Sequence, residues 1–395
     1  MSLLLLVFAI PAHAQEVEDT IRIKTRVVFL DALVKDKKSN VPVSNLTTEN
    51  FQVLDDGKPR PISYFTREGQ ARKPLAMVLI LDLREDGAGR FLKRAEVIKS
   101  MGDELAKLPP GDEVAILAMN SFEDEKRFWV MEFTNDRAKI ADALARVQAL
   151  CEKKENFPHA SEQTATGTDD KGVVETETIK GKSGGVVTRT TRKDGSVDVK
   201  RVNKDGDVTI EINGVYDIAA AVKDATHKAE ELRPNSQPSV VWVSDGIAPI
   251  FFEDRDATEQ VLIRHNVIFN SLTVDLRTLF KFLMPVGKPL AGWLGVSLYG
   301  SAKYLAQKSG GEAIKAGKPK DYSAGLARII GNLTARYSLG FALAENEVDD
   351  GRLHNLEVRV NAKDEKGKSR KLLVSSRQGY YMSTAMPKEA AARAQ

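Results

Sequence analysis

The stretch LAMVLILDLRED, residues 75–86, decides the fold of this chain. Its unbroken apolar run is typical of a central parallel strand that is covered on both faces. Polar side chains follow where the run ends, at Asp82, Arg84 and Asp86. In open α/β sheets, ligands bind beyond the carboxyl ends of the strands. The stretch therefore predicts an α/β domain with its candidate site at this strand end.

Strands and helices alternate around this stretch, across residues 73–340. SVVWVSD, residues 239–245, is a second buried strand that ends in Asp245, and VIFNSLTVD, residues 267–275, is a third. Apolar residues recur at helical spacing in three segments: 90–108, 135–150 with Asn135 as the cap, and 217–232. This alternation predicts a doubly wound, mostly parallel sheet with a Rossmann-like arrangement of helices.

Residues 15–72 and 341–384 read instead as β regions on either side of the α/β domain. The first alternates apolar and polar residues over IRIKTRVVFLDALVKD and carries a hairpin turn at Asp56-Gly57. The second holds two strands around a Lys/Gly turn and is followed by a disordered tail, residues 385–395. Because so small a sheet is marginal alone, we expect the two regions to pair into one sandwich-like unit.

Residues 152–213 interrupt the α/β alternation. RKDGSVDVKRV and NKDGDVTIEIN each place Asp-Gly between residues that favour strands, which predicts an inserted β-meander. The competing interpretation is a flexible, low-complexity loop, which the composition favours for residues 155–172.

Composition bounds the classes of function. The 58 Lys and Arg nearly balance the 55 Asp and Glu, at a net charge of +3, so no overall field attracts nucleic acid. Residues 1–14 combine a short apolar run with Ala12-His13-Ala14, which predicts a cleaved signal peptide and a periplasmic or secreted protein. Cys151 is the only cysteine, so no internal disulfide can form. No later stretch reads as a transmembrane helix.

Other chemistry finds little support in the sequence. The five histidines are dispersed, with no HExxH motif, so the sequence predicts no zinc site. No GxSxG motif or phosphate-binding loop occurs, and Cys151 has no evident base nearby. Phe251 and Phe252 follow the strand that ends in Asp245, in an expected loop over residues 247–256. Exposed aromatics there would suit a binding rim, whereas burial against a β region is the open alternative.

The order of these polar motifs resembles that of the von Willebrand factor type A domain. In that family a DxSxS motif follows the first strand, a later loop adds a threonine, and the fourth strand ends in an aspartate. Together they form a metal-ion-dependent adhesion site. This chain has Asp82-Leu83-Arg84-Glu85-Asp86, then NGVYDIAAAV from Asn213, then Asp245.

The chain is also similar, over residues 21–384 apart from the insertion, to von Willebrand factor A-related exported proteins common in acidobacteria. Four segments carry this likeness: FLDALVKDKKSNVPVSNLTTENFQVLDDGKPRPISYF at 29–65, YLAQKSGGEAI at 304–314, ARYSLGF at 335–341 and RQGYY at 377–381. The resemblance implies an A-type domain flanked by β segments and a role in binding other proteins.

The adhesion motif is degenerate, because Arg84 and Asp86 stand at its two serine positions and Asn213 at the threonine position. A guanidinium has only hydrogen-bond donors and stays charged, so Arg84 cannot ligate a metal. Our hypothesis is that Arg84 takes the place of the cation, forms a fork with Asp82 or Asp245, and leaves the site metal-free. In the alternative, Arg84 points to solvent and Asp82, Asp86, Asn213 and Asp245 bind Mg²⁺.

The sequence therefore predicts a non-enzymatic, exported module for protein interaction or adhesion, with no cofactor. Its partner would be another protein or a cell-envelope component. The expected binding face comprises Asp82, Arg84, Asp86, Asn213, Asp245, Phe251 and Phe252. A Mg²⁺-dependent adhesion protein is the first alternative, and a metal-dependent hydrolase that uses Asp82 and Asp245 is the second.

Overall fold

The structure is a computed structural model of the 395-residue chain. It describes residues 26–67, 72–84, 88–119, 127–152, 172–181, 184–206, 209–213, 218–244, 246–273, 296–364 and 366–382. For residues 209–213, 247–249, 296, 298 and 299 it describes the backbone only. The predicted signal peptide and the predicted C-terminal tail both lie outside the described residues.

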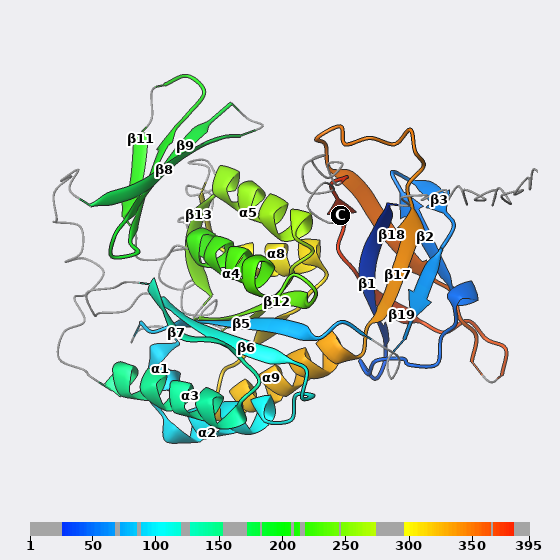
Figure 1. The fold of residues 1–395 in the computed structure, drawn as a ribbon, viewed down its shortest axis with the longest axis horizontal. Helices are drawn as coiled ribbons and strands as arrows, with labels where there is room; N and C mark the ends of the chain where they lie inside the picture. The colour runs from blue at the N-terminus through cyan, green and yellow to red at the C-terminus, as the bar shows by residue number, and fades with distance from the viewer. Residues whose placement is uncertain are drawn as a thin grey trace, which may run out of the picture.

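A six-stranded sheet forms the centre of the α/β part (Figure 1). Its order is β16-β14-β12-β5-β6-β7, and every neighbouring pair is parallel except β6 with β7. The predicted mostly parallel sheet is therefore confirmed, with an antiparallel strand at one edge. The strands are β5 (Leu75–Asp82), β6 (Glu113–Met119), β7 (Arg127–Thr134), β12 (Gln237–Ser244), β14 (Ile268–Thr273) and β16 (Ala313–Lys315).

Helices cover both faces of this sheet, which explains why β5 is buried at every position. Each face has its own apolar core, one under each group of helices in Figure 1. One group is α1 (Gly89–Leu92), α2 (Ala95–Leu105), α3 (Arg137–Glu152) and α9 (Pro319–Thr334). The other group is α4 (Ile218–Leu232), α5 (Phe252–Arg264) and α8 (Ser301–Ser309).

Two helix predictions need correction. The helix expected over residues 90–108 is divided into α1 and α2, because Arg94 adopts an extended backbone with φ −89° and ψ 122°. The helix expected to be capped by Asn135 begins at Arg137. Asp136 caps it instead, because its Oδ1 accepts hydrogen bonds from the backbone N–H groups two and three residues on, at 3.0 and 3.3 Å.

The inserted segment forms a separate four-stranded antiparallel meander in the order β11-β10-β9-β8. Its turns fall at Asp194-Gly195 and Asp205-Gly206, where the sequence places them. The residues for which a flexible loop was favoured lie almost wholly outside the described residues. The strands are β8 (Val173–Lys180), β9 (Val186–Arg192), β10 (Val197–Val202) and β11 (Thr209–Asn213); a further pair joins β13 (Ile247–Phe251) to β15 (Val296–Tyr299).

The N- and C-terminal β regions together form the β unit, which consists of two four-stranded sheets, β19-β1-β17-β4 and β20-β18-β2-β3. β1 pairs with β17 and β19, and β2 pairs with β18, so the expected pairing of the N- and C-terminal regions is confirmed. The two sheets share one apolar core, while their sandwich-like packing stays a prediction. The elements are β1 (Val27–Asp36), the 3₁₀ helix η1 (Thr48–Asn50), β2 (Phe51–Asp55), β3 (Lys58–Arg60), β4 (Tyr64–Thr66), β17 (Tyr337–Ala342), β18 (His354–Val360), β19 (Leu372–Ser375) and β20 (Gly379–Tyr380).

The chain leaves the β unit through β4 and returns through β17, and these two strands pair antiparallel, with Leu339 opposite Phe65. The α/β part is therefore inserted between two neighbouring strands of one sheet. Buried cations join the two parts. Lys35 forms an ion pair with Glu312, and Arg336 donates to the carbonyl of Gly310 at 2.5 Å.

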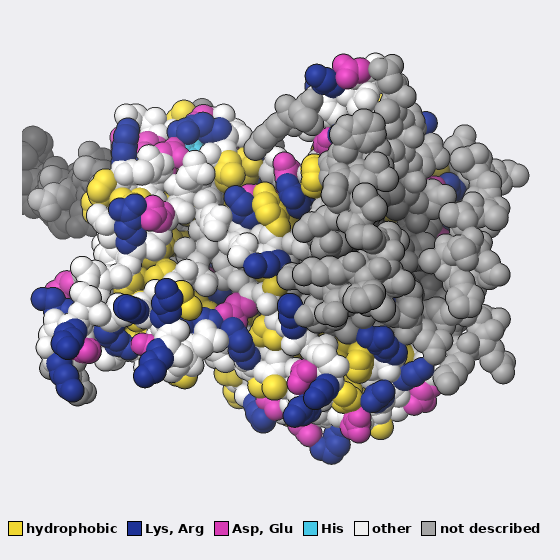
Figure 2. Space-filling view, turned by 180° about the vertical axis from the view of Figure 1, so that it is seen from behind, with side chains coloured by type: hydrophobic (Ala, Val, Ile, Leu, Met, Phe, Trp, Pro, Cys, Tyr) yellow, Lys and Arg dark blue, Asp and Glu magenta, His cyan; other side chains and the backbone are white. Residues whose placement is uncertain are grey.

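Surface charge agrees with the balanced composition. On the part of the molecule that Figure 2 colours by residue type, Lys and Arg side chains are spread over the surface, with Asp and Glu among them. Among the described residues, no helix combines the length and the apolar character needed to cross a bilayer.

Candidate functional site at the carboxyl edge of the sheet

The first candidate site lies where β5 and β12 end side by side. The two strands are parallel neighbours, with Leu81 opposite Val243. Asp82 and Ser244 follow, both fully buried, and the Ser244 hydroxyl donates to Oδ2 of Asp82 at 2.8 Å. The two strand ends that the sequence singled out are therefore adjacent.

Arg84 forms the fork with Asp82 that the sequence analysis proposed. Its Nη2 lies 2.7 Å from Oδ2 of Asp82, and its Nε lies 3.1 Å from Oδ1 and 3.2 Å from Oδ2. The backbone N–H of Arg84 also donates to Oδ1, at 3.2 Å. Only 6% of Arg84 is exposed, so this is a buried, charge-assisted pair rather than a surface ion pair.

The backbone after β5 leaves no space at Gly89. The N–H of Gly89 donates to the carbonyl of Arg84 at 2.9 Å. A Cβ at this position would lie 2.2 Å from the carbonyl oxygen of Leu83, well inside van der Waals contact. Glycine at 89 thus lets α1 close directly over the backbone that carries Arg84.

Among the candidate Mg²⁺ ligands, Asp82 is the one whose side chain the structure describes, and its carboxylate is already bonded. Both carboxylate oxygens of Asp82 are bonded to Arg84, and Oδ2 is also bonded to Ser244. A divalent ion would have to displace a buried guanidinium to reach them. Asp86, Asp245 and the side chain of Asn213 lie outside the described residues, so their part in the site stays a prediction.

Phe251 does not form an exposed rim, which corrects one of the two expectations for it. Its side chain is fully buried and packs with Val187, Val197, Val199 and Ala220, so the insertion covers it. The expected loop over residues 247–256 is instead the strand β13 followed by the start of α5. Phe252 is half-buried, and the guanidinium of Arg255 lies 4.9 Å from its ring centre.

Two ion pairs anchor the inserted meander on the first turn of α5. Arg201 on β10 contacts Glu253, with Nη2 to Oε1 at 3.0 Å and Nε to Oε2 at 3.1 Å. Arg189 on β9 lies 3.3 Å from Asp254. All four side chains are largely buried, so the meander is packed onto the α/β part rather than tethered beside it. No sequence motif predicts this docking.

Cys151 lacks the character of a nucleophile. It is a free thiol buried among apolar residues, on the face of the central sheet that α1, α2, α3 and α9 cover. Burial, and secondarily the negative charge of Asp82, raise the pKa of this thiol to about 12. The thiolate is the reactive form, so this cysteine is inert at neutral pH.

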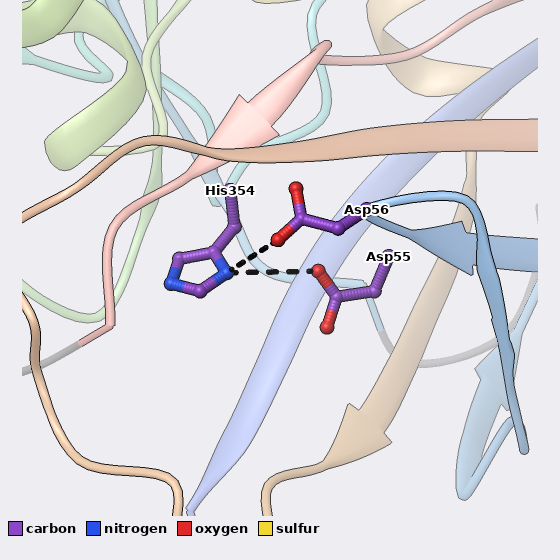
Figure 3. A group of neighbouring side chains, drawn as sticks. All are labelled: Asp55, Asp56 and His354. Carbon is purple, nitrogen blue, oxygen red and sulfur yellow. Dashed lines mark hydrogen bonds and ion pairs between the residues drawn. The ribbon is translucent and has the colours of Figure 1, made fainter.

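A second group of side chains was not predicted from the sequence, in which Asp56 belongs to a hairpin turn and His354 is one of five dispersed histidines. Asp55, Asp56 and His354 come together on the β unit, with one potential ligand atom from each within 4.8 Å of the others (Figure 3). Only the pairing of β2 with β18, about 300 residues apart in sequence, brings them together. The spacing of the motifs carried no sign of it.

Comparisons with known proteins identify no family. No protein-family model matches the sequence, and no curated protein is similar to it. Among solved structures, the VWA domain of SpRpn10 matches 64% of this chain and 93% of its own, at 9% identity and a TM-score of 0.30.

The pilus adhesin SpaC from Lactobacillus rhamnosus GG, in its open conformation, matches 86% of this chain at 8% identity and a TM-score of 0.35. This chain spans about half the length of that adhesin, 48%. Scores this low carry no argument about function, so the proposals below depend on the geometry of the chain itself.

Proposed function

We propose that the protein is a non-enzymatic, exported module of the von Willebrand factor A type that binds another protein or a cell-envelope component. The carboxyl edge of the central sheet, around Asp82 and Arg84, would be its binding face. Recognition there would need no divalent ion. The inserted meander and the β unit would hold this face on a rigid scaffold.

The buried fork between Arg84 and Asp82 is the observation that carries this proposal. In the adhesion motif that the sequence resembles, neutral hydroxyls leave a bound Mg²⁺ able to take a carboxylate from the partner. In this chain a permanent cation stands two residues after Asp82 and bonds to both of its oxygens. Removing that cation would leave a buried carboxylate uncompensated, which is costly.

Calorimetric titration with Mg²⁺ and Ca²⁺ tests the metal-free edge. We expect no binding in the micromolar range by the parent chain, and a gain of Mg²⁺ binding in Arg84→Ser, which restores a hydroxyl at the motif position. Arg72→Ser is the matched control. Arg72 forms a similar fork with the buried Asp112, at 3.0 and 2.7 Å, before the amino end of β5. That variant should gain no affinity for Mg²⁺.

Micromolar binding by the parent that is lost in Asp82→Ala would refute the metal-free edge and support Mg²⁺-dependent adhesion. Retention of envelope proteins on the immobilised chain should be the same with and without a chelator. Turnover of model esters or phosphates, abolished in Asp245→Ala, would instead favour the hydrolase alternative.

A further inference from the structure

A compact polar group lies at the β2–β3 turn of the β unit. Asp55 ends β2, Asp56 forms the turn with Gly57, and His354 begins β18 beside them. Figure 3 shows Nδ1 of the imidazole directed at both carboxylates. It lies 3.1 Å from Oδ2 of Asp56 and 3.9 Å from Oδ1 of Asp55. Both Asp55 and His354 are almost fully buried.

Asp55 is held through one oxygen and presents the other to the imidazole, whereas both oxygens of Asp56 have partners, Oδ1 the backbone of Asn355 and Oδ2 the imidazole and Arg352. Oδ2 of Asp55 accepts hydrogen bonds from Arg60, at 2.7 and 2.9 Å, and from the hydroxyl of Tyr380, at 3.1 Å. Oδ1 of Asp56 accepts from the backbone N–H of Asn355 at 2.9 Å. The side chains are therefore fixed in place while two oxygens still point toward Nδ1.

Oδ1 of Asp55 is the atom that most clearly indicates a bound ligand. Asp55 is only 4% exposed, and this oxygen has no hydrogen-bond partner among the described residues. A buried carboxylate oxygen without a partner is costly. It is directed into the group formed with Asp56 and His354, so a cation placed there would satisfy it.

The second ring nitrogen of His354, Nε2, also has the kind of partner that metal-ligating histidines have. Nε2 of His354 lies 3.2 Å from Oδ1 of Asp350. A metal-ligating histidine almost always donates its other N–H to a carboxylate or carbonyl, which fixes the tautomer. If Nε2 donates to Asp350, the lone pair of Nδ1 faces Asp55 and Asp56. Without a cation between them, that lone pair would face two anionic oxygens.

We propose that Asp55, Asp56 and His354 form a binding site for a divalent transition-metal ion, best suited to Zn²⁺. Zn²⁺ binds imidazole nitrogen and carboxylate oxygen at about 2.0–2.2 Å in a tetrahedral arrangement, which separates neighbouring ligand atoms by about 3.4 Å. The observed separations of 3.1 and 3.9 Å lie on either side of that value. Mg²⁺ and Ca²⁺ prefer oxygen ligands alone, so the nitrogen selects against them. Water would supply the fourth ligand.

Nearby charges are compatible with a divalent ion. The four acids are Asp55, Asp56, Asp350 and Glu347, and they outnumber the two neighbouring arginines by two. Arg60 is bonded to the far oxygen of Asp55 and to Glu347, so it leaves Oδ1 free to ligate. Arg352 contacts Oδ2 of Asp56 at 3.1 Å, but its side chain is 58% exposed and can turn outward into solvent.

A bound ion would join the N-terminal part of the β unit to the C-terminal part. Asp55 and Asp56 belong to the first β region, and His354 belongs to the second. The ion would therefore stabilise the long-range pairing of β2 with β18, on a different part of the molecule from the sheet edge at Asp82. This site does not depend on the proposed binding function.

Calorimetric titration of the full, tag-free chain with Zn²⁺, after chelator treatment and dialysis, tests the site. We expect one site of micromolar affinity or tighter, and a Tm that rises with the concentration of Zn²⁺. His354→Gln and Asp55→Asn should each weaken binding about tenfold or more. His265→Gln is the matched control, because His265 also pairs with a carboxylate, Glu230 at 2.9 Å, but lies outside the site.

Absence of Zn²⁺ binding by the parent chain, or equal affinity in His354→Gln, would overturn the proposal. If the variants at the buried ligands fail to fold, Asp350→Asn provides the second test, because Asp350 is well exposed at 39%. It should weaken Zn²⁺ binding by about 10–100-fold through loss of the oriented tautomer. Unchanged affinity in that variant would also count against the site. The proposal of a metal-free edge is tested by Mg²⁺ titration and variants of Arg84 and Asp82, whereas this site is tested by Zn²⁺ titration and variants of its own ligands. Either proposal can therefore be refuted while the other holds.

Discussion

Replacement of Arg84 by methionine is the sharpest test of the buried fork. The change removes the partner of a fully buried carboxylate while roughly keeping the volume and the alkyl stem of the side chain. Asp82 would lose three contacts, at 2.7, 3.1 and 3.2 Å, and keep those from Ser244 and from the backbone N–H. Breaking a buried pair by removing one partner costs about 3–5 kcal/mol, so we expect a loss of that size in the free energy of unfolding.

Urea unfolding followed by tryptophan fluorescence measures this loss, since Trp242 is buried on the neighbouring strand β12. The double variant Asp82→Asn/Arg84→Met removes both charges and should recover a large part of the loss, because replacing both members of a buried pair is often close to neutral. A loss below about 1 kcal/mol in Arg84→Met, the size of a surface pair, would refute the reasoning. Equal losses in the single and the double variant would refute it as well.

Three further predictions concern packing and pH. Gly89→Ala should lower the urea midpoint because its Cβ would collide with backbone, whereas Gly331→Ala, in α9 with nothing within 4 Å, should raise stability by up to about 1 kcal/mol; the opposite order would refute the close approach. Phe251→Ala should cost about 3–5 kcal/mol in urea unfolding, and a cost below about 1 kcal/mol would contradict its burial under the insertion. Burial alone would raise the pKa of Glu312, but the hydrogen bond and the charge of Lys35 hold it below the usual 4.5. The stability from this pair is therefore present above pH 4.5 and lost as the pH falls through the lowered pKa, so Glu312→Gln should flatten the acid limb of a Tm-against-pH curve, and an unchanged limb would contradict the pairing.

Local features of the sheet edge could be predicted because they depend on residues close together in sequence. The apolar runs that became β5 and β12 are long enough to mark buried strands, and both end in polar residues. Arg84 lies two residues after Asp82, so any extended exit from β5 brings a long side chain back to that carboxylate. The pairing of the N- and C-terminal β regions followed from the argument that neither is stable alone.

The features that could not be predicted depend on contacts between distant segments. Phe251 could face solvent or a β sheet, and only the docking of the insertion decided between these alternatives. Asp55 and His354 lie in separate β regions, and sequence patterning sets the pairing of remote strands far less strongly than it sets their existence. The break at Arg94 was missed because the apolar stripe continues across it at helical spacing.

The insertion of the α/β part between β4 and β17 has a mechanical consequence. Both connections leave the β unit on paired neighbouring strands. Tension applied between residues 26 and 382 would therefore be borne by the interstrand hydrogen bonds of the β unit. The force would bypass the parallel sheet, so the carboxyl edge of that sheet would keep its shape while the two ends of the β unit are pulled apart.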